Sequence, residues 1–269
     1  MAKTETKNSP KDLVEATPEE IEKVEGQIKE VEAEVMGTSR YPPRLSREEM
    51  EEKERLRALD AWIPKTELGK LVRAKKETNI DKVLSSGKKI LEAEIVDLLL
   101  PLQYDLLLIG QAKGKFGGGK RRAWRQTQKK TMEGNVLTFS TMAVVGDKKG
   151  HVGIGYGRAK ETLPARAKAI RMAKLNVIKV IRGFESPEPG SHDPHTVPFA
   201  IEGKCGSVRI KLLPAPRGTG LVVGDEVKKI LKLAGIKDVY GIATGQTRTT
   251  FNLAKACIDA LNKTGKMRL

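Results

Sequence analysis

The chain has 269 residues, a formal net charge of +16 at pH 7 and a hydrophobic fraction of 39%. This length allows two compact modules and an extension, because single domains usually contain about 100 to 150 residues. The excess of positive charge favours a phosphate-rich polymer over small acidic substrates, because neutralised phosphates release condensed counterions.

Charge divides the chain into two parts of opposite sign. Residues 1–60 hold 11 Lys and Arg against 16 Asp and Glu, whereas the remaining residues hold 39 against 18. We therefore expect an acidic extension followed by a strongly basic folded body.

The sequence shows no disulfide framework, signal peptide or membrane-spanning stretch typical of secreted or membrane proteins. Cys205 and Cys257 form no closely spaced pair, which predicts reduced, buried thiols. Residues 1–10 lack the apolar core of a signal peptide, and a proline and an aspartate interrupt the apolar stretch at 98–109. The sequence therefore predicts a cytosolic protein without a membrane-spanning segment.

The acidic part, residues 1–60, predicts a helical N-terminal extension. Residues 17–20 are typical of a helix start, and apolar residues then recur at spacings of three and four over 21–35. A second capping pair, Ser46 and Glu49, opens another charged run. We expect this extension to be loosely attached to the body.

Residues 61–100 predict a helical connector. Trp62 to Val72 indicates a turn followed by a short helix. Two further helices are expected over 80–84 and 90–100, the second stopped by Pro101.

Residues 101–184 predict a first α+β module. A buried strand is expected over 104–109, followed by the most basic loop of the chain, which continues to Lys130. Strands over 136–145 and 151–157, joined by a glycine-containing turn, predict a β-hairpin.

A helix with a basic outer side is expected to close this module. Helical periodicity covers 161–181 and places Ile170, Ala173, Val177 and Ile181 on one stripe. At about 100° per residue, the opposite side carries Lys168, Arg171 and Lys179.

Residues 185–194 are rich in proline and predict a linker, and residues 195–269 predict a second β-α module with a basic tail. The elements expected in this module are strands at 196–201 and 207–213, a helix at 225–234, a strand at 238–243 and a helix at 250–262.

The segment from Gly114 to Lys120 has the glycine and lysine spacing of a phosphate-binding loop. Arg121, however, occupies the position where Mg²⁺ ligation requires a Ser or Thr hydroxyl group. A phosphoryl-transfer enzyme therefore stays an alternative, and a flexible basic loop that follows an RNA backbone is favoured. The three histidines, His151, His192 and His195, lack a neighbouring cysteine, so no metal, cofactor or catalytic group is predicted.

Three glycines and two aromatic residues add to the basic pattern. Gly153, Gly155 and Gly157 alternate with period two, so they face one side of a strand and permit close approach of another backbone, protein or RNA. Phe116 and Trp124 lie in the basic loop and are candidates for stacking on splayed bases, whereas Phe139 is assigned to the core.

Residues 134–160, GNVLTFSTMAVVGDKKGHVGIGYGRAK, resemble the signature of the universal small-subunit ribosomal protein five family. Residues 203–208, 213–220 and 62–72 resemble its archaeal and eukaryotic branch, so the resemblance covers about residues 62–261.

The resemblance implies a non-enzymatic α+β protein with a βββα module like a double-stranded-RNA-binding domain, followed by a second small β-α module. It implies binding of small-subunit rRNA near the mRNA entry path and decoding region, with effects on subunit assembly and translational accuracy. The implied neighbours are mRNA and small-subunit ribosomal proteins four and eight, at the cytoplasmic ribosome, without a membrane or a small-molecule substrate. A free double-stranded-RNA-binding chaperone is the main alternative that the charge pattern permits.

The RNA-binding residues predicted from the sequence come from the basic loop, the segment before the signature, the signature, the following helix and the second module. They are Lys113, Lys115, Lys120, Arg121, Arg122, Arg125, Lys129, Lys130, Thr131, Gly134, Lys148, Lys149, His151, Gly153, Gly155, Arg158, Lys160, Lys168, Arg171 and Arg217.

Overall fold

The computed structural model describes residues 50, 53, 56, 57, 59–111, 121–184 and 194–265. The chain divides into two compact units, Met1–Arg57 and Ala58–Leu269. The described residues of the first unit are helical and exposed. The helices predicted within 17–49, the glycine-lysine spacing at 114–120, most of the proline-rich linker and the end of the basic tail lie outside the described residues.

Three short helices are present in residues 61–100, as expected: α3 (Glu67–Arg73), α4 (Ile80–Ser85) and α5 (Ala93–Leu99). Thr66 caps α3 by accepting a hydrogen bond from the Gly69 amide at 3.0 Å. The connector has a small apolar core of its own, to which the first sheet contributes Val177.

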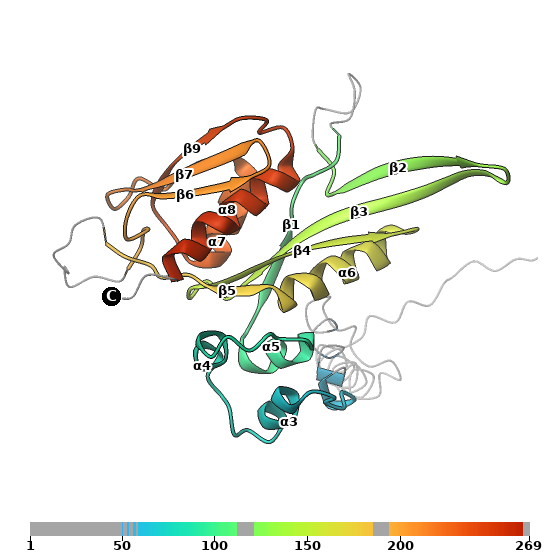
Figure 1. Cartoon of the computed structure of the whole chain (residues 1–269), viewed down its shortest axis with the longest axis horizontal. Helices are drawn as coiled ribbons and strands as arrows, with labels where there is room; N and C mark the ends of the chain where they lie inside the picture. The colour runs from blue at the N-terminus through green and yellow to red at the C-terminus, as the bar shows by residue number, and fades with distance from the viewer. Residues whose placement is uncertain are drawn as a thin grey trace, which may run out of the picture. The chain divides into compact units, whose positions relative to one another are not determined.

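The first module contains an antiparallel sheet built around one long strand (Figure 1). The short strand β1 pairs with the last residues of β3, and β2 pairs with its first residues on the same edge. The hairpin of β2 and β3 extends past the end of helix α6 (Thr162–Leu175), which covers one face of the sheet. The strands are β1 (Gln103–Leu106), β2 (Trp124–Thr131), β3 (Gly134–Gly146), β4 (His151–Ala159) and β5 (Val177–Lys179).

Helix α6 (Thr162–Leu175) packs directly on the glycines of β4. A Cβ atom on Gly155 would lie 2.1 Å from the carbonyl oxygen of Ala169, and one on Gly153 would lie 2.2 Å from that of Ala173. The close approach predicted from these glycines is therefore to a protein backbone and not to RNA.

The second module is a four-stranded sheet in the order β6-β7-β9-β8, and α7 and α8 lie together on one side of it (Figure 1). Gly235 ends α7 in the left-handed conformation with φ of 82°, so the predicted helix bounds are confirmed. The elements are β6 (Ile201–Cys205), β7 (Val208–Pro214), β8 (Leu221–Val222), α7 (Asp225–Ala234), β9 (Val239–Thr244) and α8 (Thr250–Gly265).

A single apolar core joins the two modules. Met142 and Val144 of the first sheet belong to the same buried cluster as Ile230 of α7. Helix α7 is also hydrogen-bonded to the first module at both ends: Glu226 accepts from the Leu108 amide at 2.8 Å, and the Leu233 carbonyl accepts from the Lys148 amide at 2.9 Å.

Two predicted strands were placed wrongly. The strand predicted over 104–109 ends at Leu106 and is mostly exposed, whereas the buried residues Leu107 and Ile109 follow it. No strand covers 196–200, because Thr196 makes only an isolated bridge to Gly183 and Pro198 has no amide to donate.

The predicted helix over 161–181 is too long, and part of the predicted basic loop is a strand. Helix α6 ends at Leu175, so Val177 and Lys179 belong to β5. Arg125, Lys129 and Lys130 lie on β2, whose side chains are mainly polar and therefore carry no apolar strand signal.

Candidate nucleic-acid interface

The hairpin formed by β2 and the first half of β3, residues 124–140, is exposed on both faces along most of its length. On β2 only Thr127 is half-buried, and the other seven residues of the strand are exposed. We call this hairpin the arm. Two strands without a covering layer bury little apolar surface, so contacts within the chain contribute little to the stability of the arm.

One row of side chains crosses the base of the arm. Arg125 on β2 is opposite Ser140 on β3, and Ser140 is opposite Arg158 on β4, so all three share one face of the sheet. Neighbouring strands are about 4.8 Å apart, which places the two arginine backbones roughly 10 Å from each other. Both arginines are exposed, and Tyr156 donates a hydrogen bond to the hydroxyl group between them at 3.2 Å.

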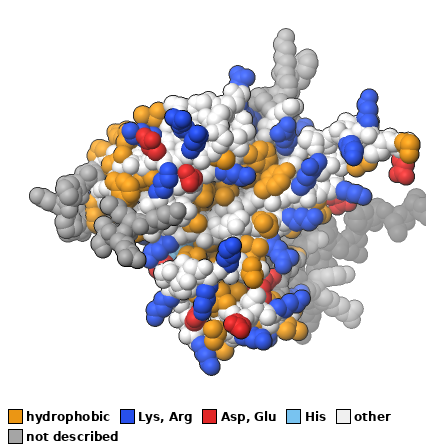
Figure 2. Space-filling model, viewed as in Figure 1, with side chains coloured by type: hydrophobic (Ala, Val, Ile, Leu, Met, Phe, Trp, Pro, Cys, Tyr) orange, Lys and Arg blue, Asp and Glu red, His pale blue; other side chains and the backbone are white. Residues whose placement is uncertain are grey.

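The two arginines can bind phosphate because no acidic side chain on these strands neutralises their charge. None of the residues of β2, β3 and β4 is Asp or Glu. Lys129 lies on the same face as Arg125, four residues along β2 toward the tip. Figure 2 shows Lys and Arg side chains distributed along the arm.

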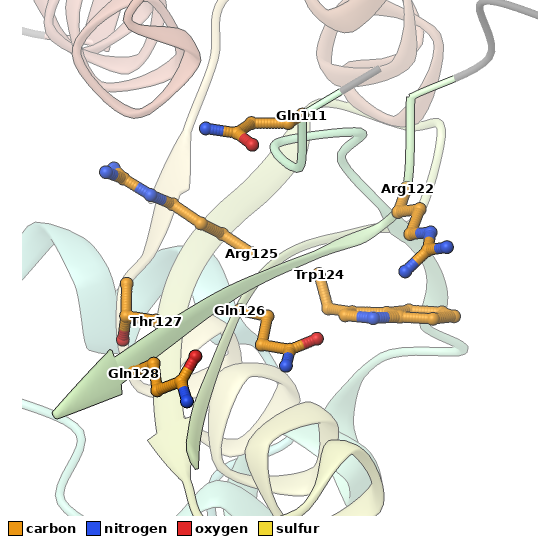
Figure 3. A pocket seen from close by; sticks show the side chains of 7 residues that line it. All are labelled: Gln111, Arg122, Trp124, Arg125, Gln126, Thr127 and Gln128. Carbon is orange, nitrogen blue, oxygen red and sulfur yellow. The ribbon is translucent and has the colours of Figure 1, made fainter. Parts of the chain in front are cut away.

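An open pocket lies beside the base of β2 and combines one aromatic ring with guanidinium and amide groups (Figure 3). The Trp124 ring, 37% exposed, and the Gln126 amide point to one side of β2, and Arg125 points to the other. An exposed ring can stack on a base, and amides can donate to and accept from base edges. The lining residues are Gln111, Arg122, Trp124, Arg125, Gln126, Thr127 and Gln128.

Sequence reasoning missed the glutamines of this pocket. Because Gln126 and Gln128 are uncharged, they did not contribute to the basic pattern. The available signal was the run of eight polar or amphipathic residues immediately before a two-residue turn and a strongly β-forming segment.

The proposed site residues do not form one patch. Arg121, Arg122, Arg125, Lys129, Lys130, Thr131, Gly134, Arg158 and Lys160 are exposed on or near the arm, and Lys168 and Arg171 are exposed on the outer side of α6. Lys148 and Lys149 are exposed at the other end of β3, and a strand of that length spans about 40 Å. Arg217 is exposed in the segment after β7, and Lys113, Lys115 and Lys120 lie outside the described residues.

Three proposed site residues face the protein interior. Gly153 and Gly155 are covered by α6, which leaves no room for RNA. His151 is 9% exposed, with Nδ1 at 2.6 Å from Asp147 and Nε2 at 3.0 Å from Asp81. These three residues are therefore structural, and the proposed RNA-binding surface does not include them.

Burial disfavours the charged form of His151, but its hydrogen bonds to Asp147 and Asp81 outweigh that effect and raise its pKa. The pKa values of Asp147 and Asp81 are lowered, because burial is outweighed by the hydrogen bonds that each carboxylate accepts. Carboxylates at both ring nitrogens favour the doubly protonated imidazolium. His151 thus joins α4 to the turn between β3 and β4.

The remaining titratable groups give no sign of a metal centre. Within the described ranges, no group of three His, Cys, Asp or Glu side chains is placed to hold a metal ion. His195 is buried, and its Nδ1 lies at hydrogen-bonding distance, 2.9 Å, from Asp238. Both cysteines are free thiols, and burial raises the pKa of Cys257 to about 12.

Among the residues that the structure describes, no helix has the length and apolar character needed to span a bilayer.

Known family models match a segment of each module. The family model for the N-terminal domain of ribosomal protein S5 matches residues 123–181, and the model for the C-terminal domain of ribosomal protein S5 matches residues 203–268. This chain belongs to the ribosomal protein S5 family. The first matched segment contains the arm and α6, and the second contains most of the second module.

Archaeal relatives named small ribosomal subunit protein uS5 match most of the chain. The relative from Nanoarchaeum equitans is 49% identical over 212 residues, which cover 78% of this chain and 91% of the relative. The relative from Thermoplasma volcanium is 43% identical over 211 residues, covering 78% and 89%. The relative from Methanococcus maripaludis strain C6 is 43% identical over 210 residues, covering 78% and 85%.

Membership of the ribosomal protein S5 family decides between the function classes left open by the sequence. Proteins of this family are structural components of the cytoplasmic ribosome, so the chain is a structural component of the small ribosomal subunit and not a phosphoryl-transfer enzyme. The mixed α+β architecture with two sheets agrees with the two domains of the family.

Proposed function

We propose that the chain binds and folds small-subunit rRNA near the mRNA entry path and the decoding region, where it supports subunit assembly and translational accuracy. The observation that carries this proposal is the pair of exposed arginines, Arg125 on β2 and Arg158 on β4, which flank the buried Ser140 on one face of strands that contain no acid. Phosphate charge supplies the affinity, and the shape of the arm selects the site.

The first module, residues 101–184, acts in this proposal like a double-stranded-RNA-binding domain. The order β2, β3, β4 and α6 is a βββα arrangement, and it supports this assignment. Residues 61–100 are then a connector, residues 185–194 a linker between modules and residues 195–269 the second domain, after an extension of residues 1–60. Recognition of a helical RNA would come from backbone and ribose contacts, because duplex RNA is recognised mainly by shape.

The proposed partners are rRNA, mRNA at the entry path, and small-subunit ribosomal proteins four and eight. Family membership supports these partners. The exposed cations on α6 and at the turn between β3 and β4 are the proposed secondary RNA contacts.

Binding of the full chain to small-subunit rRNA at several salt concentrations tests the proposal. The double variant Arg125→Ala/Arg158→Ala should bind about tenfold or more weakly, and the slope of log affinity against log salt should fall by up to about two. A control variant, Lys88→Ala/Lys89→Ala, removes the same charge from an exposed segment of the connector and should change both quantities little. Equal affinities and slopes for the two double variants would contradict the proposal.

A further inference from the structure

The second sheet has one covered face and one open face. Helices α7 and α8 cover the face that carries Ile201, Val208 and Leu212, all of which are buried. Side chains alternate along each strand, so the intervening residues occupy the opposite face. We call this the open face: Glu202 and Lys204 on β6, Arg209, Lys211 and Leu213 on β7, Val222 on β8, and Tyr240, Ile242 and Thr244 on β9.

Apolar side chains meet across three strands at one end of the open face. Tyr240 is opposite Val222 on one side and opposite Leu213 on the other, and Ile242 follows on the same strand. Val222 is 50% exposed and Ile242 is 54% exposed. Contiguous exposed apolar side chains, in contrast to single ones, mark interaction sites.

Cations gather at the other end of the open face. Lys204 is opposite Arg209, which is opposite Thr244, so two cations lie side by side on β6 and β7. Glu202 is the one acidic residue of the four strands, and it forms an ion pair with Lys211 at 3.3 Å. The charge of Lys204 and Arg209 is therefore not balanced on this face.

We propose that the open face docks another protein, through a surface that carries an apolar patch beside Asp or Glu side chains. Interface centres are rich in apolar and aromatic residues, and Leu213, Val222, Tyr240 and Ile242 supply such residues on the open face. RNA fits less well, because a single tyrosine is a poor stacking platform and half of the face is apolar. A second copy of this chain also fits less well, because the open face offers only one carboxylate in return.

This docking surface goes beyond the RNA contacts of the arm and does not depend on them. The arm projects from the first module, whereas the open face belongs to the second. Variants of one surface therefore test it without altering the other.

Photocrosslinking in purified small subunits tests the proposal. Full chains that carry benzoylphenylalanine in place of Ile242 should crosslink to a protein, at a peptide that contains Asp or Glu. Benzoylphenylalanine in place of Leu163, which is 73% exposed on α6, is the control for non-specific capture. A crosslink from position 242 to RNA, a crosslink to a second copy, or no crosslink above the control would overturn the proposal.

Charge reversal tests the electrostatic part with the same crosslink. Arg209→Glu should lower its yield about fivefold or more at low salt, because like charges across an interface repel. Lys88→Glu, a charge reversal in the connector, should leave the yield unchanged. Unfolding curves that match the wild type would show that both variants fold, and an unchanged yield for Arg209→Glu would overturn this part.

Discussion

His151 connects segments that are far apart in the sequence, because its two ring nitrogens contact carboxylates on α4 and on the turn between β3 and β4. Lys179 on β5 also contacts Asp81 at 3.2 Å. The cluster fixes the helical connector to the first sheet. Its effect on stability depends on the charge of the imidazole ring.

Stability should therefore fall as pH rises above 6.5. The pKa of His151 is raised from 6.5, so its contribution is complete below pH 6.5 and is lost as pH rises through the folded-state pKa. The lowered carboxylate pKa values add stability above about pH 3.8, which is lost as pH falls through their folded-state values. Denaturant unfolding of the wild type and of His151→Gln between pH 6 and 9 measures this. Parallel curves for the two proteins would contradict the imidazolium assignment.

Gly155 shows how closely α6 approaches the first sheet. Gly155→Ala should lower the free energy of unfolding by about 3 kcal/mol, because the new Cβ would lie 2.1 Å from a backbone oxygen. Gly224→Ala is the matched control, since no atom lies within 4 Å of a Cβ there. It should lower the free energy of unfolding by about 1 kcal/mol or less, because Gly224 is the N-cap of α7 and alanine is the poorer N-cap. Equal effects in urea unfolding would show that the helix can move away.

The arm and the strands behind it should differ in local stability. Strand β2 is exposed, whereas β4 is mostly buried beneath α6. Free protein should therefore exchange the amide hydrogens of residues 124–131 much faster than those of 151–157. Addition of rRNA should slow exchange in the arm. Equal protection of both strands in the free protein, or no change in the arm with rRNA, would contradict its role as the binding element.

The sequence predicted elements with a clear apolar period and missed those without one. The hairpin of β3 and β4, the connector helices and α7 follow from turns, caps and apolar spacing. Strand β2 could not be predicted in this way, because Gln126, Gln128 and Lys130 face solvent and leave no apolar alternation. The short strand β5 was absorbed into the helix prediction because Val177 continues the spacing of the helix stripe.

The sequence predicted which kinds of residue form the candidate site, but only partly where they lie in the fold. Charge alone identified Arg125 and Arg158, but their shared face follows from strand register, which the sequence does not specify. Gly153 and Gly155 were proposed to contact RNA because glycines on one side of a strand permit close approach of another backbone, and His151 was proposed with them. Pairing with neighbouring strands and with α6 instead buries all three residues.

At the scale of the whole folded body, the two modules should unfold together. Ile230 of α7 is fully buried in the core that both modules share, so Ile230→Ala should destabilise both by about 2 to 5 kcal/mol. Hydrogen exchange in β4 reports on the first module, and thiol labelling of the buried Cys257 reports on the second. Separate unfolding midpoints for the two probes would contradict a common core.

The amount of the chain in small ribosomal subunits tests the central claim most directly. In sucrose gradients, the wild type and Lys88→Ala/Lys89→Ala should sediment with small subunits at one copy per particle. Arg125→Ala/Lys129→Ala/Arg158→Ala should be depleted from them and shift toward the top of the gradient, because the arm has lost its phosphate-binding charge. Full occupancy by the triple variant, or a wild-type chain that sediments apart from small subunits, would contradict the account.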